Sequence, residues 1–253
     1  MLLLLHGLTA NAHAFGGLVT AGLGAGFSVV SLDLRGRGLS DHPAFRYSME
    51  EHAADVVALI ESLGVECVHI CGHSFGAFLG VYLAAEHPEK VEKLVMLDAG
   101  VQMNSKAGEM LMPRLMMLEQ VFSGWDEYLA NIKAAPYLTV WDDAMEEYYR
   151  ADVKEVEDGI TPRPSLVNII EASKGLGAQP WREILPRVQQ PTLLLHANEP
   201  YTLGEPLLWE HDALETVAMM PDARYAVVPG NHQTMLYGEG AQAIVRKVQA
   251  FLQ

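Results

Sequence analysis

Five consecutive residues place a nucleophilic side chain between two glycines. Gly72-His73-Ser74-Phe75-Gly76 follows an apolar run of strand type and precedes an apolar run of helical type. A serine on so tight a strand-to-helix turn is held in a strained conformation, and small residues on both sides avoid clashes. The backbone N–H of Phe75, at the start of the helix, can donate to an oxyanion. We therefore predict that Ser74 is a catalytic nucleophile.

The regions around this turn alternate between strands and helices. Short apolar runs of strand length are separated by longer runs with helical spacing. One of these helical runs begins at the capping box of Ser48 and Glu51 and stops at Gly64. The strand-like runs are Leu2–Leu5, Phe27–Asp33, Val65–Cys71, Lys93–Asp98, Thr192–His196 and Arg224–Val228. This alternation predicts an α/β fold with a mostly parallel central sheet and helices on both faces.

The stretch from Gly100 to Gln190 interrupts the alternation. It is rich in Met, Trp and Tyr, it has helical spacing without a clear β run, and its only linker-like segment is Gly159 to Pro164. We predict a single domain over residues 1–253, into which residues 100–190 insert a helical cap. The methionine and aromatic side chains favour an apolar acyl or aromatic pocket, although most of them are expected to form the core of the cap itself.

Composition and charge exclude several classes of protein. The 17 basic and 32 acidic residues give a formal charge of −15, which argues against a nucleic-acid partner. Leu2–Leu5 is too short for a signal peptide, and no apolar run approaches the ~18 residues of a membrane span. Cys67 and Cys71 are expected ~13 Å apart on one strand, too far for a disulfide. We expect a cytoplasmic protein with neither metal nor cofactor, since no motif for either occurs. The oligomeric state is not indicated.

These features together resemble the α/β-hydrolase superfamily over nearly the whole chain. His6-Gly7 follows the first strand, and the resemblance implies that the backbone N–H of Leu8 is the second oxyanion donor beside that of Phe75. The segment Asp33–Asp41 resembles a loop that braces the active site in that superfamily without taking part in the chemistry. Superfamily members usually begin with a hairpin of two strands, which this chain lacks, so we expect its sheet to lack an edge.

The resemblance also assigns the general base. His232 follows the last strand within Pro229-Gly230-Asn231-His232 and matches the loop histidine that accepts the nucleophile's proton in this superfamily. The order of nucleophile first and histidine last along the chain agrees with this assignment. His196, at the end of an earlier strand, is the one serious rival.

Three residues are candidates for the carboxylate that orients His232. It usually follows the strand at Thr192–His196, but the loop here lacks the usual Gly and Asp and offers Glu199 and Glu205 instead. Some branches carry the acid one strand earlier, where Asp98 stands on the rim that binds ligands. We assign Asp98 as the triad acid and keep Glu199 and Glu205 as alternatives, as well as a purely structural role for Asp98 in capping its strand.

A serine nucleophile, a histidine base and two backbone donors suit acyl transfer to water through a tetrahedral intermediate. We predict a carboxylesterase-like serine hydrolase acting on small or medium apolar esters through an acyl-enzyme. A lactonase or a thioesterase would use the same residues, and a carbon–carbon bond hydrolase resembles the same pattern. A receptor-like binding protein that hydrolyses its ligand slowly is the alternative from another class. Serine at the turn excludes the dehalogenase and epoxide-hydrolase branches, which carry Asp there.

Overall fold

A computed structural model describes residues 1–253, with six parallel strands in one central sheet. The strands are β1 (Leu2–Leu5), β2 (Val29–Leu32), β3 (Val68–His73), β4 (Val91–Leu97), β7 (Thr192–Ala197) and β8 (Ala223–Val228). They lie in the order β2-β1-β3-β4-β7-β8, and every neighbouring pair is parallel. The α/β fold with a parallel central sheet is confirmed. Strand β2 forms one edge of this sheet, with no further strand beyond it.

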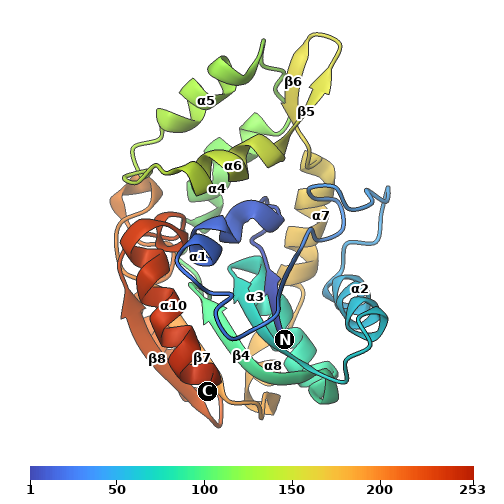
Figure 1. The fold of residues 1–253 in the computed structure, drawn as a ribbon, viewed down its shortest axis with the longest axis vertical. Coiled ribbons are helices and arrows are strands. Elements are labelled where there is room, and N and C mark those ends of the chain that lie inside the picture. Colours follow the sequence, from blue (N-terminus) through green and yellow to red (C-terminus); the bar gives the residue numbers. More distant parts are fainter.

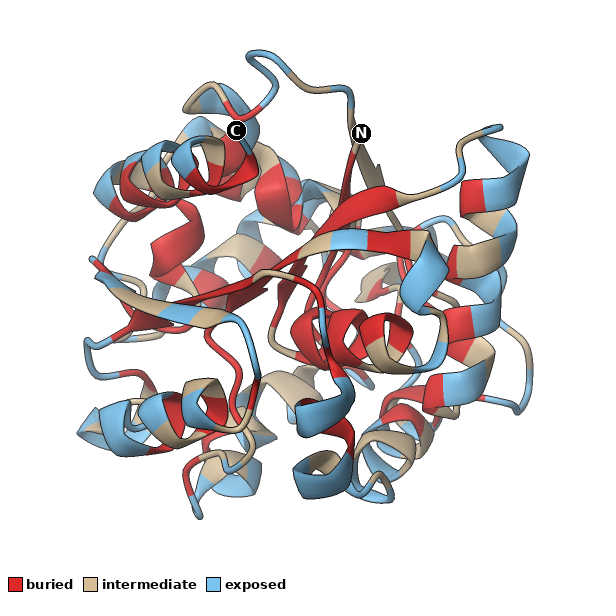
Figure 2. Ribbon diagram, turned by 90° about the horizontal axis from the view of Figure 1, so that it is seen from below, coloured by how far each residue is buried: buried red, intermediate tan, exposed pale blue.

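Alternating side chains along the strands divide the apolar core into two layers. Leu2 and Leu4 pack on one face of the sheet and Leu3 and Leu5 on the other, and all four are fully buried. Burial on both faces explains why these strands are continuous apolar runs in the sequence. In Figure 2 the sheet is largely red between helices whose outer sides are blue.

Helices cover both faces, as predicted (Figure 1). The first face is covered by α1 (Gly16–Thr20) and α10 (Gly238–Leu252). The second is covered by α2 (Met49–Ser62), α3 (Phe75–Glu86), α7 (Leu166–Gly177), α8 (Trp181–Ile184) and α9 (Glu210–Ala218). No helix combines the length and the apolarity needed to cross a lipid bilayer.

The strand order places the carboxyl ends of β1 and β3 side by side. Leu5 pairs with Gly72 across the two strands, so the segments that follow them leave the sheet at the same edge. From β1 the chain passes to β2 on one side, and β3 then returns on the other side of β1. In open α/β sheets, ligands bind at such a switch in direction.

The inserted residues place helices above this edge (Figure 1), namely α4 (Ala107–Met117), α5 (Trp125–Lys133) and α6 (Asp143–Asp152). The prediction that the insertion has no β run is wrong. An antiparallel hairpin of β5 (Val153–Val156) and β6 (Gly159–Pro162) follows α6 and includes most of the segment that looked like a linker. Each strand has only four residues and most of their side chains are at least partly exposed, so no apolar pattern marks them.

Glycine at position 76 lets α3 approach β1. A Cβ on Gly76 would overlap the carbonyl oxygen of Leu5, a backbone atom held in the sheet. We expect Gly76→Ala to lower the free energy of unfolding by about 1–3 kcal/mol, as overpacking does, and Gly76→Val to reduce soluble yield. Urea unfolding of the purified variants measures the change.

Gly108→Ala is the matched control, because Gly108 lies in α4 and a Cβ there meets no atom within 4 Å. Its helix propensity should rise, so its stability should stay the same or increase by up to about 1 kcal/mol. A Gly76→Ala protein as stable as Gly108→Ala would contradict the close approach of α3 to β1.

Candidate active site

Ser74 occupies the turn between β3 and α3 in a conformation that non-glycine residues rarely adopt. Its backbone angles are φ 54° and ψ −117°, and its N–H donates to the carbonyl of Leu97 at 3.0 Å. A Cβ on Gly72 would overlap the carbonyl of Gly76, and a Cβ on Gly76 would overlap the carbonyl of Leu5, so each flanking glycine is required by a backbone group packed against it. This is the strained strand-to-helix turn that the sequence predicts, and it presents the serine at the carboxyl edge of the sheet.

His232 and Asp98 form a buried hydrogen-bonded pair. The Nδ1 atom of His232, in the loop after β8, lies 2.7 Å from Oδ2 of Asp98, which follows β4. The other carboxylate oxygen accepts the N–H of Ala197 at 3.0 Å, so both Asp98 oxygens are held. Asp98 has a φ of 50°, a conformation that Asp tolerates better than most residues. The pair leaves Nε2 as the ring nitrogen of His232 available to Ser74.

The two alternative carboxylates lie elsewhere. Glu199 accepts the N–H of Gly230 at 3.0 Å and donates its own N–H to the carbonyl of Gly230, so it braces the histidine loop from outside. Glu205 forms an ion pair with Lys106 at 2.5 Å and accepts a hydrogen bond from Asn104. Asp98 is therefore the carboxylate at the histidine ring.

The rival base His196 has both ring nitrogens occupied. Nδ1 lies 2.8 Å from the hydroxyl of Tyr225, and Nε2 lies 3.0 Å from the carbonyl of Leu208. His73, inside the turn, directs Nε2 to the carbonyl of His232 at 2.8 Å. Burial, and then the neighbouring His232, hold the pKa of His73 well below its usual range, so the ring is neutral and donates this bond. His73 thus fixes the loop that carries His232.

Two backbone donors lie free beside the serine. Neither the N–H of Leu8 nor that of Phe75 donates to another group of the chain. His6 accepts the N–H of Leu34 through Nε2 at 3.0 Å, so its Nδ1 carries the proton and donates to the carbonyl of Gly7 at 2.8 Å. Burial lowers the pKa of His6 to about 4, which keeps it in this neutral form. Because C=O and N–H point in opposite directions across a trans peptide, the bond to Gly7 sets the direction of the Leu8 N–H.

Ser74 and His232 line one cavity of about 60 Å³, together with Leu8. Side chains from the insertion and from the loop after β7 complete its wall: Leu111, Arg114, Tyr137, Tyr148, Tyr149 and Tyr201. A second cavity, of about 710 Å³, adjoins the first. Four side chains line both cavities and form the partition between them: Arg114, Tyr137, Tyr149 and Tyr201. None of the methionines that suggested an apolar pocket lines this smaller cavity, whose lining combines four tyrosines and Arg114 with apolar side chains such as Leu111 and Leu236.

Arg114 is the functional candidate that sequence reasoning missed. Its Nη2 lies 2.6 Å from Oδ2 of Asp152, and the hydroxyl of Tyr128 reaches the same oxygen at 2.5 Å. Burial by itself would lower the pKa of Arg114, but Asp152 beside it raises the pKa well above its ordinary value, so the side chain is charged. An arginine within the Met- and Leu-rich run of α4 was the signal in the sequence.

Comparison with known proteins agrees with this geometry. The family model described as alpha/beta hydrolase fold matches residues 1–232. The 2-(acetamidomethylene)succinate hydrolase of Mesorhizobium japonicum is 27% identical over 233 residues, which span 91% of this chain and 80% of that protein. The N-formylmaleamate deformylase of Pseudomonas putida is 38% identical over 101 residues, 40% of this chain and 37% of that protein.

Among solved structures, the crystal structure of E-2-(acetamidomethylene)succinate hydrolase superposes with a TM-score of 0.87 at 26% identity, covering 100% of this chain and 91% of the other. The enol-lactonase of Burkholderia xenovorans has a TM-score of 0.73 at 23% identity over 99% of this chain and 90% of its own, which shows a shared fold. The chain therefore belongs to the α/β-hydrolase fold family and is a hydrolase of that family.

Proposed function

We propose that this hydrolase transfers the acyl group of a small carboxylic ester to water, with Ser74 as nucleophile, His232 as general base and Asp98 as the acid that orients it. The observation that carries the proposal is the buried 2.7 Å hydrogen bond between Asp98 and His232 at the cavity that also receives Ser74 from its strained turn. A nucleophile, a base and a group that orients the base are the parts that nucleophilic acyl transfer requires.

The arrangement supports each step of this reaction. His232 accepts the hydroxyl proton of Ser74 through Nε2 as the serine oxygen attacks the ester carbonyl, and Asp98 stabilises the imidazolium through Nδ1. The oxyanion that forms accepts hydrogen bonds from the N–H groups of Leu8 and Phe75. Collapse of the tetrahedral intermediate releases the alcohol, which takes the proton from His232. A water molecule then attacks the acyl carbonyl while His232 accepts its proton; the bond to Ser74 Oγ breaks, His232 returns the proton to that oxygen, and the carboxylic acid is released.

The dimensions of the site favour a short acyl group. A cavity of about 60 Å³ holds only a few water-sized groups, since one water molecule needs about 10–15 Å³ in the same measure, and this room suits a short acyl group. The larger cavity beyond the tyrosine partition has the room for the remainder of the substrate. Lactones and thioesters of similar size meet the same reactive groups.

A second candidate substrate is a small N-acyl compound that carries a carboxylate. Arg114 lines both cavities, and its bond to Asp152 uses only part of its five N–H donors. A guanidinium inside the site of a chain with net charge −15 is suited to recognise a carboxylate. The names of two relatives, 2-(acetamidomethylene)succinate hydrolase and N-formylmaleamate deformylase, describe substrates of this chemical kind.

Replacement of the nucleophile tests the reaction class. We expect Ser74→Ala to lower kcat on p-nitrophenyl acetate by at least about a thousandfold, because Oγ is the attacking atom, with little change in the unfolding midpoint. A panel of p-nitrophenyl esters should show acetate preferred to octanoate. Multiple turnover by purified Ser74→Ala would overturn the proposal, and a single acylation without turnover in the wild type would indicate a receptor instead.

Two carboxylate variants distinguish the triad acid from its neighbour in the histidine loop. We expect Asp98→Asn to lower kcat by at least about a hundredfold, or roughly 2.7 kcal/mol, because the amide cannot stabilise the imidazolium of His232. Glu199→Gln is the matched control and should stay within about tenfold, since Glu199 contacts only the backbone of the loop. Equal losses in the two variants would contradict the assignment of Asp98.

The role of Arg114 is tested with a charged ester and a neutral one of similar shape. Because removing Arg114 alone would leave Asp152 buried and unpaired, the variant combines Arg114→Met with Asp152→Asn. We expect its kcat/KM to fall at least about tenfold for monomethyl succinate and less than about threefold for methyl pentanoate. Asp152→Asn alone keeps the guanidinium and is the control. Equal losses on both esters would exclude carboxylate recognition by Arg114.

A further inference from the structure

One buried guanidinium in this chain has no carboxylate partner. Arg37 is fully buried and forms no salt bridge. Its Nε donates to the carbonyl of Leu8 at 3.0 Å, and its Nη1 donates to the carbonyl of Arg35 at 2.7 Å and contacts Nε2 of His52 at 3.1 Å. His52 donates through Nδ1 to the carbonyl of Ser48, so its Nε2 is an acceptor. Burial, and then the charge of Arg37, lower the pKa of His52 to about 3, so this partner is neutral.

The guanidinium also lies against two aromatic rings. Its central carbon is 5.4 Å from the ring centroid of Phe75 and 5.9 Å from that of Tyr47. One side chain thus contacts both residues whose N–H groups face the proposed oxyanion, Leu8 through its carbonyl and Phe75 through its ring. His6 already holds the peptide between Gly7 and Leu8, and Arg37 holds the next peptide, so Leu8 is fixed from both sides.

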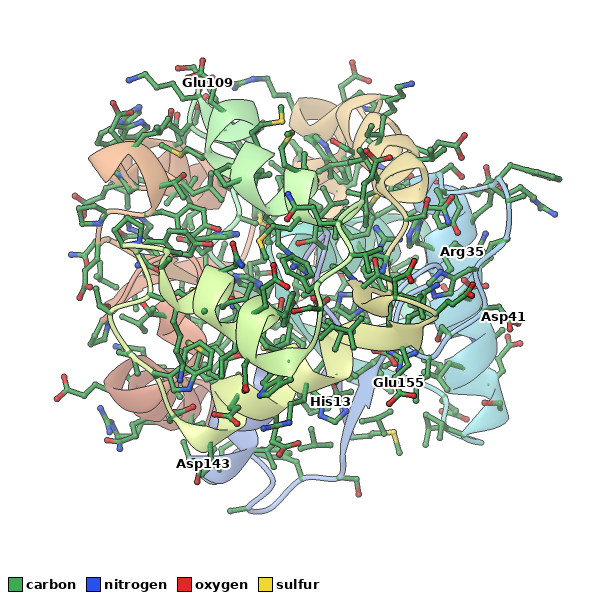
Figure 3. All side chains as sticks on the ribbon, turned by 90° about the horizontal axis from the view of Figure 1, so that it is seen from above. His13, Arg35, Asp41, Glu109, Asp143 and Glu155 are labelled. Atoms are coloured by element: carbon green, nitrogen blue, oxygen red, sulfur yellow. The ribbon has the colours of Figure 1, made fainter.

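A charge in this position is costly to the fold. Burying an ion without a counter-ion costs several kcal/mol even after relaxation, and burial lowers the pKa of Arg37 to about 10 without neutralising it at pH 7. Arg35, two residues earlier, has the more usual arrangement for an arginine, in which a carboxylate balances its charge. It lies at the periphery of the molecule (Figure 3), where it forms a two-pronged pair with Asp55 at 2.6 and 2.7 Å.

We propose that Arg37 is a positioning residue of the oxyanion hole, which aligns the N–H groups of Leu8 and Phe75 and places a fixed positive charge behind them. The proposal rests on the proposed function, because it takes these two groups as the oxyanion donors. A charge held in a water-poor site interacts with the oxyanion far more strongly than it would in water. Negative charge develops on that oxygen only as the tetrahedral intermediate forms, so the effect falls on kcat and hardly on KM.

The test compares Arg37→Met and Arg37→Lys with Arg35→Met, a matched control in the same segment. The measurements are kcat and KM on p-nitrophenyl acetate, and the inhibition constant of phenylboronic acid, which forms a tetrahedral adduct with a reactive serine. We expect Arg37→Met to lower kcat by at least about thirtyfold with KM within about threefold, and to weaken boronate inhibition by at least about tenfold. Arg37→Lys should recover part of the loss, because it restores the charge without the directed bonds. Arg35→Met should stay within about threefold on all three quantities.

Labelling of Ser74 by a fluorophosphonate distinguishes a failure of the proposed role of Arg37 from a failure of the proposed function. If the wild type labels at Ser74 and turns over the ester while folded Arg37→Met keeps wild-type kcat and boronate inhibition, the positioning role is overturned and the serine hydrolase stands. If the wild type neither labels nor turns over, the proposed function fails and the role of Arg37 fails with it. Should Arg37→Met not fold, Arg37→Lys decides: wild-type kcat and boronate inhibition overturn the proposal, and a fall in kcat at constant KM supports it.

Discussion

Parallel pairing of β1 with β3 is the constraint on which the rest of the site depends. It brings the loop after Leu5 to the start of α3, and the absence of a side chain at Gly76 lets that helix begin against the β1 backbone. The N–H groups of Leu8 and Phe75 come together at Ser74 only because these two strands are neighbours. A shift of one residue in this pairing would direct every β1 side chain to the opposite face and would separate the two donors.

The other half of the site depends on strands farther along the sheet. Three adjacent strands, β4, β7 and β8, lead to Asp98, Ala197 and His232 respectively. The Asp98 carboxylate links these strands through two hydrogen bonds, one from the N–H of Ala197 and one with the ring of His232. The histidine loop is then held from two sides, by His73 from the turn and by Glu199 from the loop after β7. In its proposed role as the base, a histidine held this way needs little reorganisation when it takes a proton, which is the condition for efficient proton transfer and for electrostatic stabilisation.

The insertion gives the site its chemical character. Seen from above, the labelled acidic side chains of the insertion, Glu109, Asp143 and Glu155, lie on its surface (Figure 3). The lining of the cavity at Ser74 instead includes Arg114 and four tyrosines. This contrast between an acidic exterior and a partly cationic interior supports the second candidate substrate proposed above, one that carries a carboxylate. The sheet alone is common to hydrolases of many specificities, so discrimination between substrates depends on these inserted residues.

The sequence by itself determined the features that local patterns encode. Apolar runs of strand length located all six strands of the sheet, the capping box of Ser48 and Glu51 located the start of α2, and two glycines around Ser74 marked a turn that few other sequences can adopt. Only the tertiary structure showed which of Asp98, Glu199 and Glu205 contacts the His232 ring, because Asp98 and His232 are 134 residues apart and their contact depends on the order of the strands. The β5–β6 hairpin, the placement of Arg114 and the burial of Arg37 against Leu8 and Phe75 were likewise decided by packing between distant segments, which local patterns of residue types do not specify.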